Sequence, residues 1–194
     1  MDYKKRIQST EGYVAHFTKT PFVLQKKARK LCQKHDQDPE DKEILKALFG
    51  TCNDHVNIAS GFHCDYGFNI HFHGFCVMNY NCVILDTSPV HIGTGAFIGP
   101  NVTITCAGHG ILPAQRKEGM NTSKPITIED NVWIGANCII CPGVTIGKDS
   151  IIGAGSVVTK DIPEGVIAFG NPCRVQRKIT QEDHLEYSKG LERE

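Results

Sequence analysis

The sequence has no excess of charge of either sign, no long apolar run and a single tryptophan. Its 194 residues include 21 Lys plus Arg and 21 Asp plus Glu, so the formal net charge is zero. A nucleic-acid-binding domain normally shows a basic excess or stripe, and a membrane span needs about 20 consecutive apolar residues. Because both features are missing, we expect neither a nucleic acid nor a membrane as partner.

Signals for secretion and for a disulfide framework are also missing. The first thirty residues contain no apolar stretch followed by a small-residue cleavage site. The nine cysteines are an odd number scattered along the chain, which favours reduced thiols in the cytoplasm. Cys138 and Cys141 form a C-x-x-C without the second ligand pair that a zinc site would need. His71 and His73 also lack partner ligands, so we interpret them as surface histidines.

What the sequence does contain is a strict six-residue repeat. Aliphatic residues recur at Ile92, Ile98 and Ile104, and again at Ile128, Ile134, Ile140, Ile146, Ile152 and Val158. Most units read Ile-Gly-x-x-small-x, as in IGPNVT, IGANCI and IGAGSV, and FHGFCV and MNYNCV continue the period more weakly towards the N-terminus. Fixed-period self-similarity is the signature of a solenoid, and a six-residue unit indicates a parallel β-helix.

The period has a simple physical interpretation. Three short strands form one triangular coil of about eighteen residues, so every sixth aliphatic side chain points inward and stacks on the next coil. We expect glycine at the corners, where φ must be unusual. A sandwich or barrel would instead require alternation with period two and hairpin turns.

The flanking segments divide the chain into three parts. Residues 1–50 are predicted to be helical, with starts at Thr20-Pro21 and Asp38-Pro39 and an apolar stripe beginning at Phe22. Residues 51–178 form the predicted β-helix, interrupted by a loop at about 105–125. Residues 179–194 form a predicted helical tail, because Thr180-Gln-Glu-Asp is typical of a capping box that would open a helix to about Gly190.

Several motifs carry a specific resemblance. The stretches CDYGFNI, MNYNCVILD, AGH, PITIEDNVWIGANCII, GAGSVVTKDIP and GNPCRV resemble the maltose and galactoside O-acetyltransferase family of hexapeptide-repeat acyltransferases over residues 40 to 180. The resemblance implies a left-handed parallel β-helix and a homotrimer with active sites between subunits. It also implies acetyl-CoA as co-substrate, a sugar hydroxyl as acceptor and no required metal.

The resemblance assigns the interrupted repeat a role. In this family the long loop leaves the β-helix and reaches towards a neighbouring subunit, and the histidine at its start is the catalytic base. His109 in AGH matches that position. The chemistry is reasonable, because a sugar hydroxyl is a poor nucleophile until its proton is removed and imidazole exchanges protons near neutral pH. A thioester is already activated, so direct attack needs no covalent enzyme intermediate.

Other positions match the family with graded specificity. On the acceptor side, the motifs point to Asp65, Asn79 and Asp86. On the acetyl-CoA side, they point to Trp133, Ala136, Ala154, Thr159, Lys160, Arg174 and Arg177. In the family the backbone near Ala136 serves the oxyanion, and the two arginines match phosphate contacts, to which guanidinium geometry is suited. The structural alternatives are corner residues, a packed surface indole and ordinary solvated charge.

Two departures from the family leave the acceptor open. Several relatives have an acidic residue in the N-terminal segment, whereas this chain has Thr18, Lys19 and Thr20. The second half of the loop has no acidic residue close to its proline, and Glu118 is the only nearby candidate. Maltose, glucose, a galactoside or a non-sugar hydroxyl compound such as a xenobiotic therefore all stay open as acceptors.

Rival functions are less well supported. A γ-class carbonic anhydrase shares the fold but needs three interface histidines, and only His91 and His109 lie between residues 80 and 180. A non-catalytic scaffold would be expected to lose the loop histidine or the acetyl-CoA motifs, which are present. Xenobiotic relatives have a longer loop and a C-terminal extension, and serine acetyltransferases have a larger helical N-terminal domain.

Overall fold

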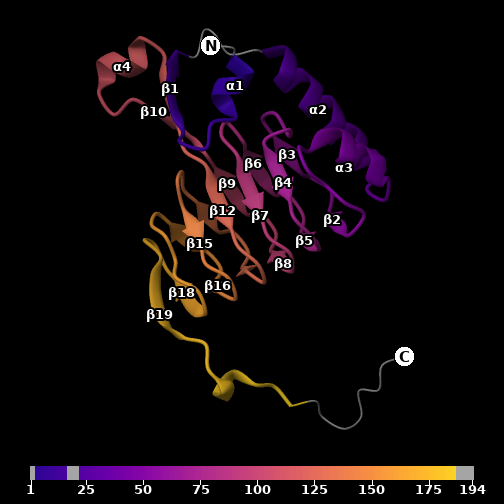
Figure 1. The fold of residues 1–194 in the computed structure, drawn as a ribbon, viewed down its shortest axis with the longest axis vertical. Coiled ribbons are helices and arrows are strands. Elements are labelled where there is room, and N and C mark those ends of the chain that lie inside the picture. Colours follow the sequence, from indigo (N-terminus) through magenta and orange to yellow (C-terminus); the bar gives the residue numbers. More distant parts are fainter. Residues whose placement is uncertain (1–2, 17–21, 187–194) are drawn as a thin grey trace.

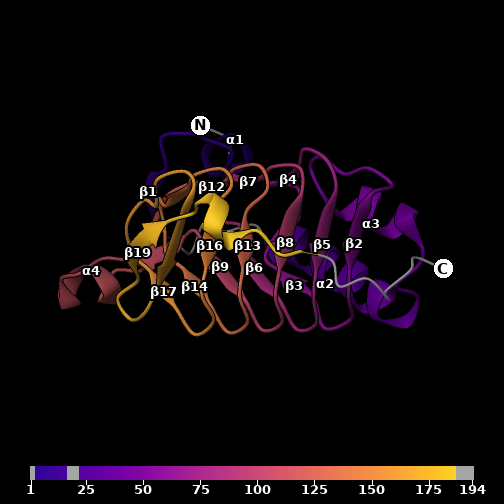
Figure 2. The same ribbon diagram turned by 90° about the horizontal axis from the view of Figure 1, so that it is seen from below.

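The computed structural model describes residues 3–16 and 22–186. Short parallel strands wind into a three-faced solenoid of about six turns, so the predicted β-helix is confirmed. Figure 2 shows β2, β5, β8, β13 and β16 following one another along the solenoid axis. No described helix is long and apolar enough to cross a membrane.

Each face of the solenoid is one parallel sheet. The first face contains β4 (Ile70–Phe72), β7 (Val90–Ile92), β12 (Ile126–Ile128) and β15 (Thr145–Ile146). The second contains β2 (Val56–Ile58), β5 (Cys76–Met78), β8 (Ala96–Ile98), β13 (Trp133–Ile134), β16 (Ile151–Ile152) and β18 (Val166–Phe169), ending in the antiparallel β19 (Arg174–Lys178). The third contains β3 (His63–Cys64), β6 (Val83–Leu85), β9 (Thr103–Thr105), β14 (Ile139–Ile140) and β17 (Val157–Val158).

The periodic aliphatic residues form the core. Each residue of the six-residue series from Ile92 to Val158 is at most 2% exposed. Parallel pairing places them in register, as in Ile98 opposite Ile134 and Ile134 opposite Ile152. Full burial of one such side chain contributes roughly 1.5–3 kcal/mol, so the inward ladder is the main source of stability.

The corner that joins the second face to the third has its own steric rule. This glycine corner comprises residues 79–82, 99–102, 135–138 and 153–156. A Cβ on Gly135 would lie 2.6 Å from the backbone nitrogen of Ala154, so close approach of the coils requires this glycine. The left-handed φ values fall two residues later instead, on Asn101 and Asn137, both at 58°. Our expectation of glycine where φ is unusual holds at this corner for Gly155, whose φ is 72°, whereas asparagine occupies the equivalent position of the other coils.

The N-terminal segment contains more than helices. It forms α1 (Tyr3–Ile7), β1 (Tyr13–His16), α2 (Phe22–Gln37) and α3 (Lys42–Leu48), with α2 and α3 beside the first coils (Figure 1). The predicted start at Thr20-Pro21 lies outside the described residues. α3 begins later than predicted, because the Asp41 side chain accepts from the Glu43 N–H and caps it there. Phe22 is 61% exposed and does not join the core.

The C-terminal tail is a single turn within the described part of the chain. η2 (Gln181–Asp183) is a 3-10 helix, and the Asp183 carboxylate accepts from the Thr180 N–H at 2.9 Å. Residues 184–186 are not helical, and Gly190, the predicted end of the tail helix, lies outside the described residues.

Candidate active site

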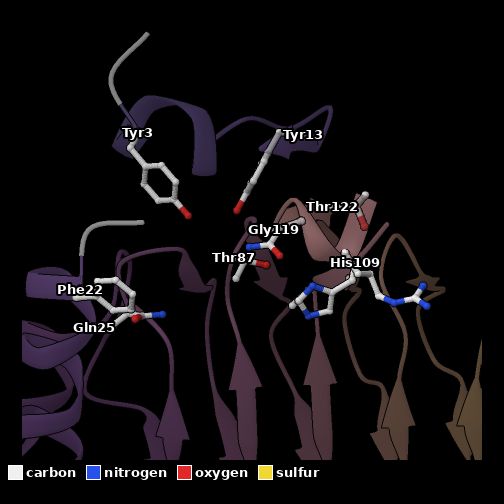
Figure 3. A pocket seen from close by; sticks show the side chains of 12 residues that line it. Tyr3, Tyr13, Phe22, Gln25, Thr87, His109, Gly119 and Thr122 are labelled. Atoms are coloured by element: carbon white, nitrogen blue, oxygen red, sulfur yellow. The ribbon is translucent and has the colours of Figure 1, made fainter. Parts of the chain in front are cut away.

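A cavity of about 410 Å³ lies where the loop, the N-terminal segment and the first coils meet. Figure 3 shows Tyr3 of α1 and Tyr13 of β1 above it, Phe22 and Gln25 of α2 on one side, and His109 on the other. The loop leaves the solenoid where the third face turns into the first. We call this the loop corner, and it comprises residues 65–69, 86–89, 106–125, 141–144 and 159–161.

The loop is an ordered structure of its own. It contains β10 (Ala107–His109), α4 (Pro113–Lys117) and β11 (Met120–Ser123). β11 pairs antiparallel with both β10 and β1, so the N-terminal segment and the loop share one three-stranded sheet. The Arg116 guanidinium donates to the carbonyls of Gly110 and Ile111 at 2.9 and 2.5 Å. These bonds fix the backbone immediately after His109.

His109 is exposed and lines the cavity. In the described parts of the chain, no side chain or backbone group forms a hydrogen bond with its imidazole. Both ring nitrogens are therefore available to a molecule in the cavity. A base that is open to a pocket and held by a paired strand is suitably placed to take a proton from a bound hydroxyl group.

The two predicted aspartates also lie at the loop corner, but beneath the cavity. Asp65 accepts from the Gln25 side chain at 3.3 Å, and burial raises the pKa of its carboxyl. Asp86 is fully buried and accepts from the N–H groups of Asp65 and Tyr66 at 3.0 and 2.8 Å. Burial raises the pKa of the Asp86 carboxyl to about 7. Asp86 thus holds the backbone under the cavity, and neither aspartate lines it.

Asn79, Ala136 and Ala154 lie together at the glycine corner, away from His109. Asn79 is exposed and its side-chain oxygen accepts from the Tyr80 N–H. Ala136 lies one coil from Ala154, since the Ala136 carbonyl accepts from the Gly155 N–H at 2.8 Å. The structure therefore groups Asn79 with the predicted acetyl-CoA residues rather than with the two aspartates.

The remaining predicted residues continue along the later coils. Trp133 is 53% exposed on the second face, between Phe97 and Ile151. Thr159 and Lys160 are exposed at the loop corner, one coil beyond Cys141.

The two predicted arginines lie on β19, at the end of the solenoid. Both are exposed. Arg174 donates to the Cys173 carbonyl at 2.8 Å, and Arg177 forms an ion pair with Asp183 at 2.6 Å. Together, the residues predicted for acetyl-CoA provide an exposed indole (Trp133), two small corner residues (Ala136 and Ala154) and three cations (Lys160, Arg174 and Arg177). This combination suits a long ligand with a thioester at one end and phosphates at the other.

Comparisons with known proteins agree with this geometry. Residues 125–160 match the family model described as "Hexapeptide repeat of succinyl-transferase". The chain is 41% identical to a galactoside O-acetyltransferase of Lactococcus lactis, covering 96% of this chain and 92% of that protein. A maltose O-acetyltransferase structure from Clostridium difficile 630 superposes with a TM-score of 0.86 at 40% identity, covering 93% of this chain and 99% of that chain. The chain belongs to the maltose and galactoside O-acetyltransferase family of hexapeptide-repeat acyltransferases.

A third relative in this acetyltransferase family was solved with a ligand. The structure of a hexapeptide-repeat acetyltransferase from Vibrio cholerae in complex with acetyl coenzyme A superposes with a TM-score of 0.85 at 31% identity. It covers 93% of this chain and 100% of that chain. Membership of the acetyltransferase family confirms the resemblance stated from the motifs.

Sequence reasoning missed several lining residues. Tyr3, Tyr13, Gln25 and Arg116 all line the cavity, yet none belongs to a repeat unit. Tyr13 could have been found from the YVAH stretch, because Tyr and Val favour strands. The sequence gives no indication that this strand pairs with the loop.

His71 and His73, which we interpreted as surface residues, both stack on His91 on the first face. The ring of His91 lies 4.9 Å from that of His71 and 5.2 Å from that of His73. The His73 Nε2 and His91 Nδ1 atoms are 2.9 Å apart. Burial lowers the pKa of His71 and of His91. Within the described ranges, no group of histidine, cysteine and acidic side chains has a geometry that could hold a metal ion.

Proposed function

We propose that this protein transfers the acetyl group of acetyl-CoA to a hydroxyl group of a sugar. One observation carries the proposal: His109 begins the loop and opens onto a cavity of about 410 Å³, in a chain 41% identical to a galactoside O-acetyltransferase. Family membership supports the acyl transfer, and the cavity beside the base supports a small acceptor.

The reaction needs one base and one activated carbonyl. His109 removes the proton of the acceptor hydroxyl as its oxygen attacks the thioester carbon. A tetrahedral intermediate forms, and the carbon–sulfur bond then breaks. The thiolate of CoA takes the proton back from the imidazolium, so the products are the acetyl ester and free CoA thiol. No bond between the acetyl group and the enzyme is required.

An oxyanion donor is available at the glycine corner. The backbone N–H of Ala136 donates to no acceptor within the described part of the chain, whereas its neighbours Gly135 and Asn137 donate to Ile152 and Pro100. An unpaired N–H at an ordered corner can stabilise the negative charge that develops on the thioester oxygen. This observation supports the role that the family motif gives to Ala136.

The two halves of the proposed site need a second subunit. His109 lies at the loop corner and Ala136 at the glycine corner, and the third face separates the two corners within one chain. A closed three-fold assembly would bring the loop corner of one subunit to the glycine corner of the next. We therefore propose a homotrimer, which sedimentation would show as about three times the chain mass of 21.4 kDa. The cytoplasmic location stays a prediction.

Replacement of His109 tests the function. We expect His109→Ala to lower kcat at least roughly a hundredfold, the usual scale for loss of a general base, with acetyl-CoA affinity by calorimetry unchanged. His55→Ala is the matched control, because His55 is exposed and does not line the cavity. The measurement is thiol release from acetyl-CoA with a panel of neutral sugars. Near-full kcat in His109→Ala would refute the assignment.

A further inference from the structure

Five side-chain hydroxyls follow one another beside the cavity, and we call them the hydroxyl chain: Tyr66, Tyr3, Tyr13, Thr87 and Ser123. The Tyr66 and Tyr3 oxygens are 3.4 Å apart, and those of Thr87 and Ser123 are 2.7 Å apart. The Tyr13 phenol lies between these two pairs, since Tyr3, Thr87 and Ser123 are the polar neighbours that act on its pKa. In Figure 3 the oxygens of Tyr3 and Tyr13 point towards Thr87 and the cavity.

The direction of these hydrogen bonds follows from Ser123, the last member of the hydroxyl chain. Ser123 donates its only hydroxyl hydrogen to the Cys106 carbonyl at 3.1 Å. Thr87 therefore donates to Ser123, and a phenol beside this pair meets lone pairs rather than a free hydroxyl hydrogen. Burial, followed by the neighbouring Tyr3, raises the pKa of the Tyr13 phenol, so it stays protonated near neutral pH. The hydroxyl hydrogens of Thr87 and Ser123 are thus directed at protein acceptors. Lone pairs of the hydroxyl chain are left to accept from a ligand.

The cavity also lacks a group that would neutralise a cation. Within the described ranges, its lining carries hydroxyls and amides but no carboxylate, and Arg116 is its one permanent cation. The Asp65 carboxylate lies behind Gln25 and accepts from it at 3.3 Å. A ligand with an ammonium group would lose hydration here and find the Arg116 guanidinium instead of a counter-charge, which is unfavourable.

We propose that Tyr13 is a specificity-determining residue for the acceptor, and that the cavity selects uncharged polyhydroxyl compounds against amine-bearing ones. This inference rests on the proposed function. Acceptor hydroxyls donate to the lone pairs of the hydroxyl chain and accept from the amide of Asn121, which lies opposite His109 in the β10–β11 pair. Aromatic side chains of Tyr3, Tyr13 and Phe22 provide surface for the apolar face of a sugar ring.

Adding a carboxylate to the lining tests the selection. We expect kcat/KM for glucose to exceed that for glucosamine at least roughly tenfold at a pH where the amine is protonated. Asn121→Asp should narrow or reverse this ratio, because it adds the missing counter-charge. 2-Deoxyglucose separates the loss of a hydroxyl from the gain of a charge. Gln33→Glu, which adds the same charge at an exposed position of α2, should leave the ratio unchanged.

The hydroxyl of Tyr13 is tested by its removal. Tyr13→Phe should raise KM for the neutral acceptor roughly three- to tenfold, the scale of one hydrogen bond, and leave KM for acetyl-CoA unchanged. Val14→Thr is the control, since Val14 is exposed on the other side of β1. A thermal melt of each variant reports any loss of folding, which would move both KM values. A change confined to acetyl-CoA, or no change at all, would overturn the role of Tyr13.

The inference and the proposed function fail in different ways. Thiol release with glucosamine at or above the rate with glucose would overturn the selection, although the transferase activity and its dependence on His109 would stand. Absence of thiol release with the whole panel of neutral and amino sugars would refute the proposed function, and this inference with it.

Discussion

The glycine corner and the loop corner connect coils of the same spacing, but they do so with different kinds of residue. At the glycine corner the sequence reads GPNV, GANC and GAGS on successive coils, and small residues let the backbones approach closely. At the loop corner the repeat stops, and polar side chains from four parts of the chain meet around His109. The regular corner leaves a narrow surface of small residues, whereas the interruption provides a cavity lined by a histidine.

The comparison supports our proposal that one chain holds two half-sites. The residues 79–82, 99–102, 135–138 and 153–156 contain no carboxylate or histidine, so the glycine corner supplies backbone groups and shape. The loop corner supplies the carboxylates and His109. Neither corner has both parts of an acyl transfer site, namely a base for the hydroxyl and a donor for the oxyanion.

The largest effect is expected when two inactive variants are mixed. This experiment tests whether each active site is shared between two subunits. His109→Ala removes the base, and Ala154→Trp adds bulk at an exposed position of the glycine corner and should block acetyl-CoA. Each alone should be nearly inactive. Every mixed trimer would contain, among its three sites, one with an intact half from each variant, so separated mixed trimers should show about a third of wild-type kcat.

The measurement is thiol release by the co-expressed pair after separation of tagged mixed assemblies. A control pair carries both changes on one chain with wild-type partners. Random mixing should lower its activity from about half to about a quarter of wild type, because only a site between two wild-type subunits is then intact. If the mixture of single variants stays inactive while trimers form, each site lies within one subunit and the division between the two corners is wrong.

The repeat was predictable because burial imposes it on the sequence. Ile98, Ile134 and Ile152 face inward on successive coils, and only aliphatic residues fit there, so the period shows without any alignment. His109 was predictable for a related reason: it stands where the period ends. The family motifs supplied the remaining residues, from Asp65 to Arg177.

What could not be predicted depends on contacts between segments far apart in sequence. β1 pairs with β11 across more than a hundred residues, and no local pattern encodes that partner. Tyr13 becomes a lining residue only through this pairing. The position of Asn79 also requires the coil geometry, since the motif alone grouped it with Asp65 and Asp86.

The buried carboxylate of Asp86 at the loop corner predicts that the free energy of unfolding depends on pH. The glycine corner has no carboxylate or histidine that could contribute to this dependence. The pKa of Asp86 is raised from 3.8 to about 7, so between these values the folded protein binds more protons than the unfolded chain. Stability therefore decreases as pH rises from about 4 to 7, by on the order of a few kcal/mol from this group. Asp86→Asn should flatten this slope, because an amide does not titrate. The variant should still fold, because the amide oxygen can accept from the Asp65 and Tyr66 N–H groups.

Melting temperatures of the wild type and Asp86→Asn across pH 4 to 8 provide the measurement. Asp54→Asn is a suitable control, since Asp54 is exposed in an ion pair with Lys46 and the pKa of its carboxyl is lowered by that lysine. Identical slopes for the wild type and Asp86→Asn would show that Asp86 stays charged in the folded protein.

The smallest expected effect concerns the far end of the acetyl-CoA half-site, where Arg177 is already paired. Asp183 accepts two hydrogen bonds from its guanidinium at 2.6 and 2.8 Å, and Arg177 holds the pKa of that carboxyl down to about 2. If Arg177 binds a phosphate of CoA, this pair must open. Arg177→Ala should then raise KM for acetyl-CoA several-fold, whereas Asp183→Asn should lower it roughly two- to threefold.

The acceptor KM should stay unchanged in both variants, because contacts remote from the reacting carbon act as uniform binding. Both effects should weaken at high salt. The acetyl thioester of dephospho-CoA, which lacks the 3′-phosphate, tells which phosphate is involved: the effect of Arg177→Ala disappears if that group is the partner. A rise in KM for acetyl-CoA in Asp183→Asn would show instead that the pair serves to hold η2 against β19, and that the acetyl-CoA half-site ends before β19.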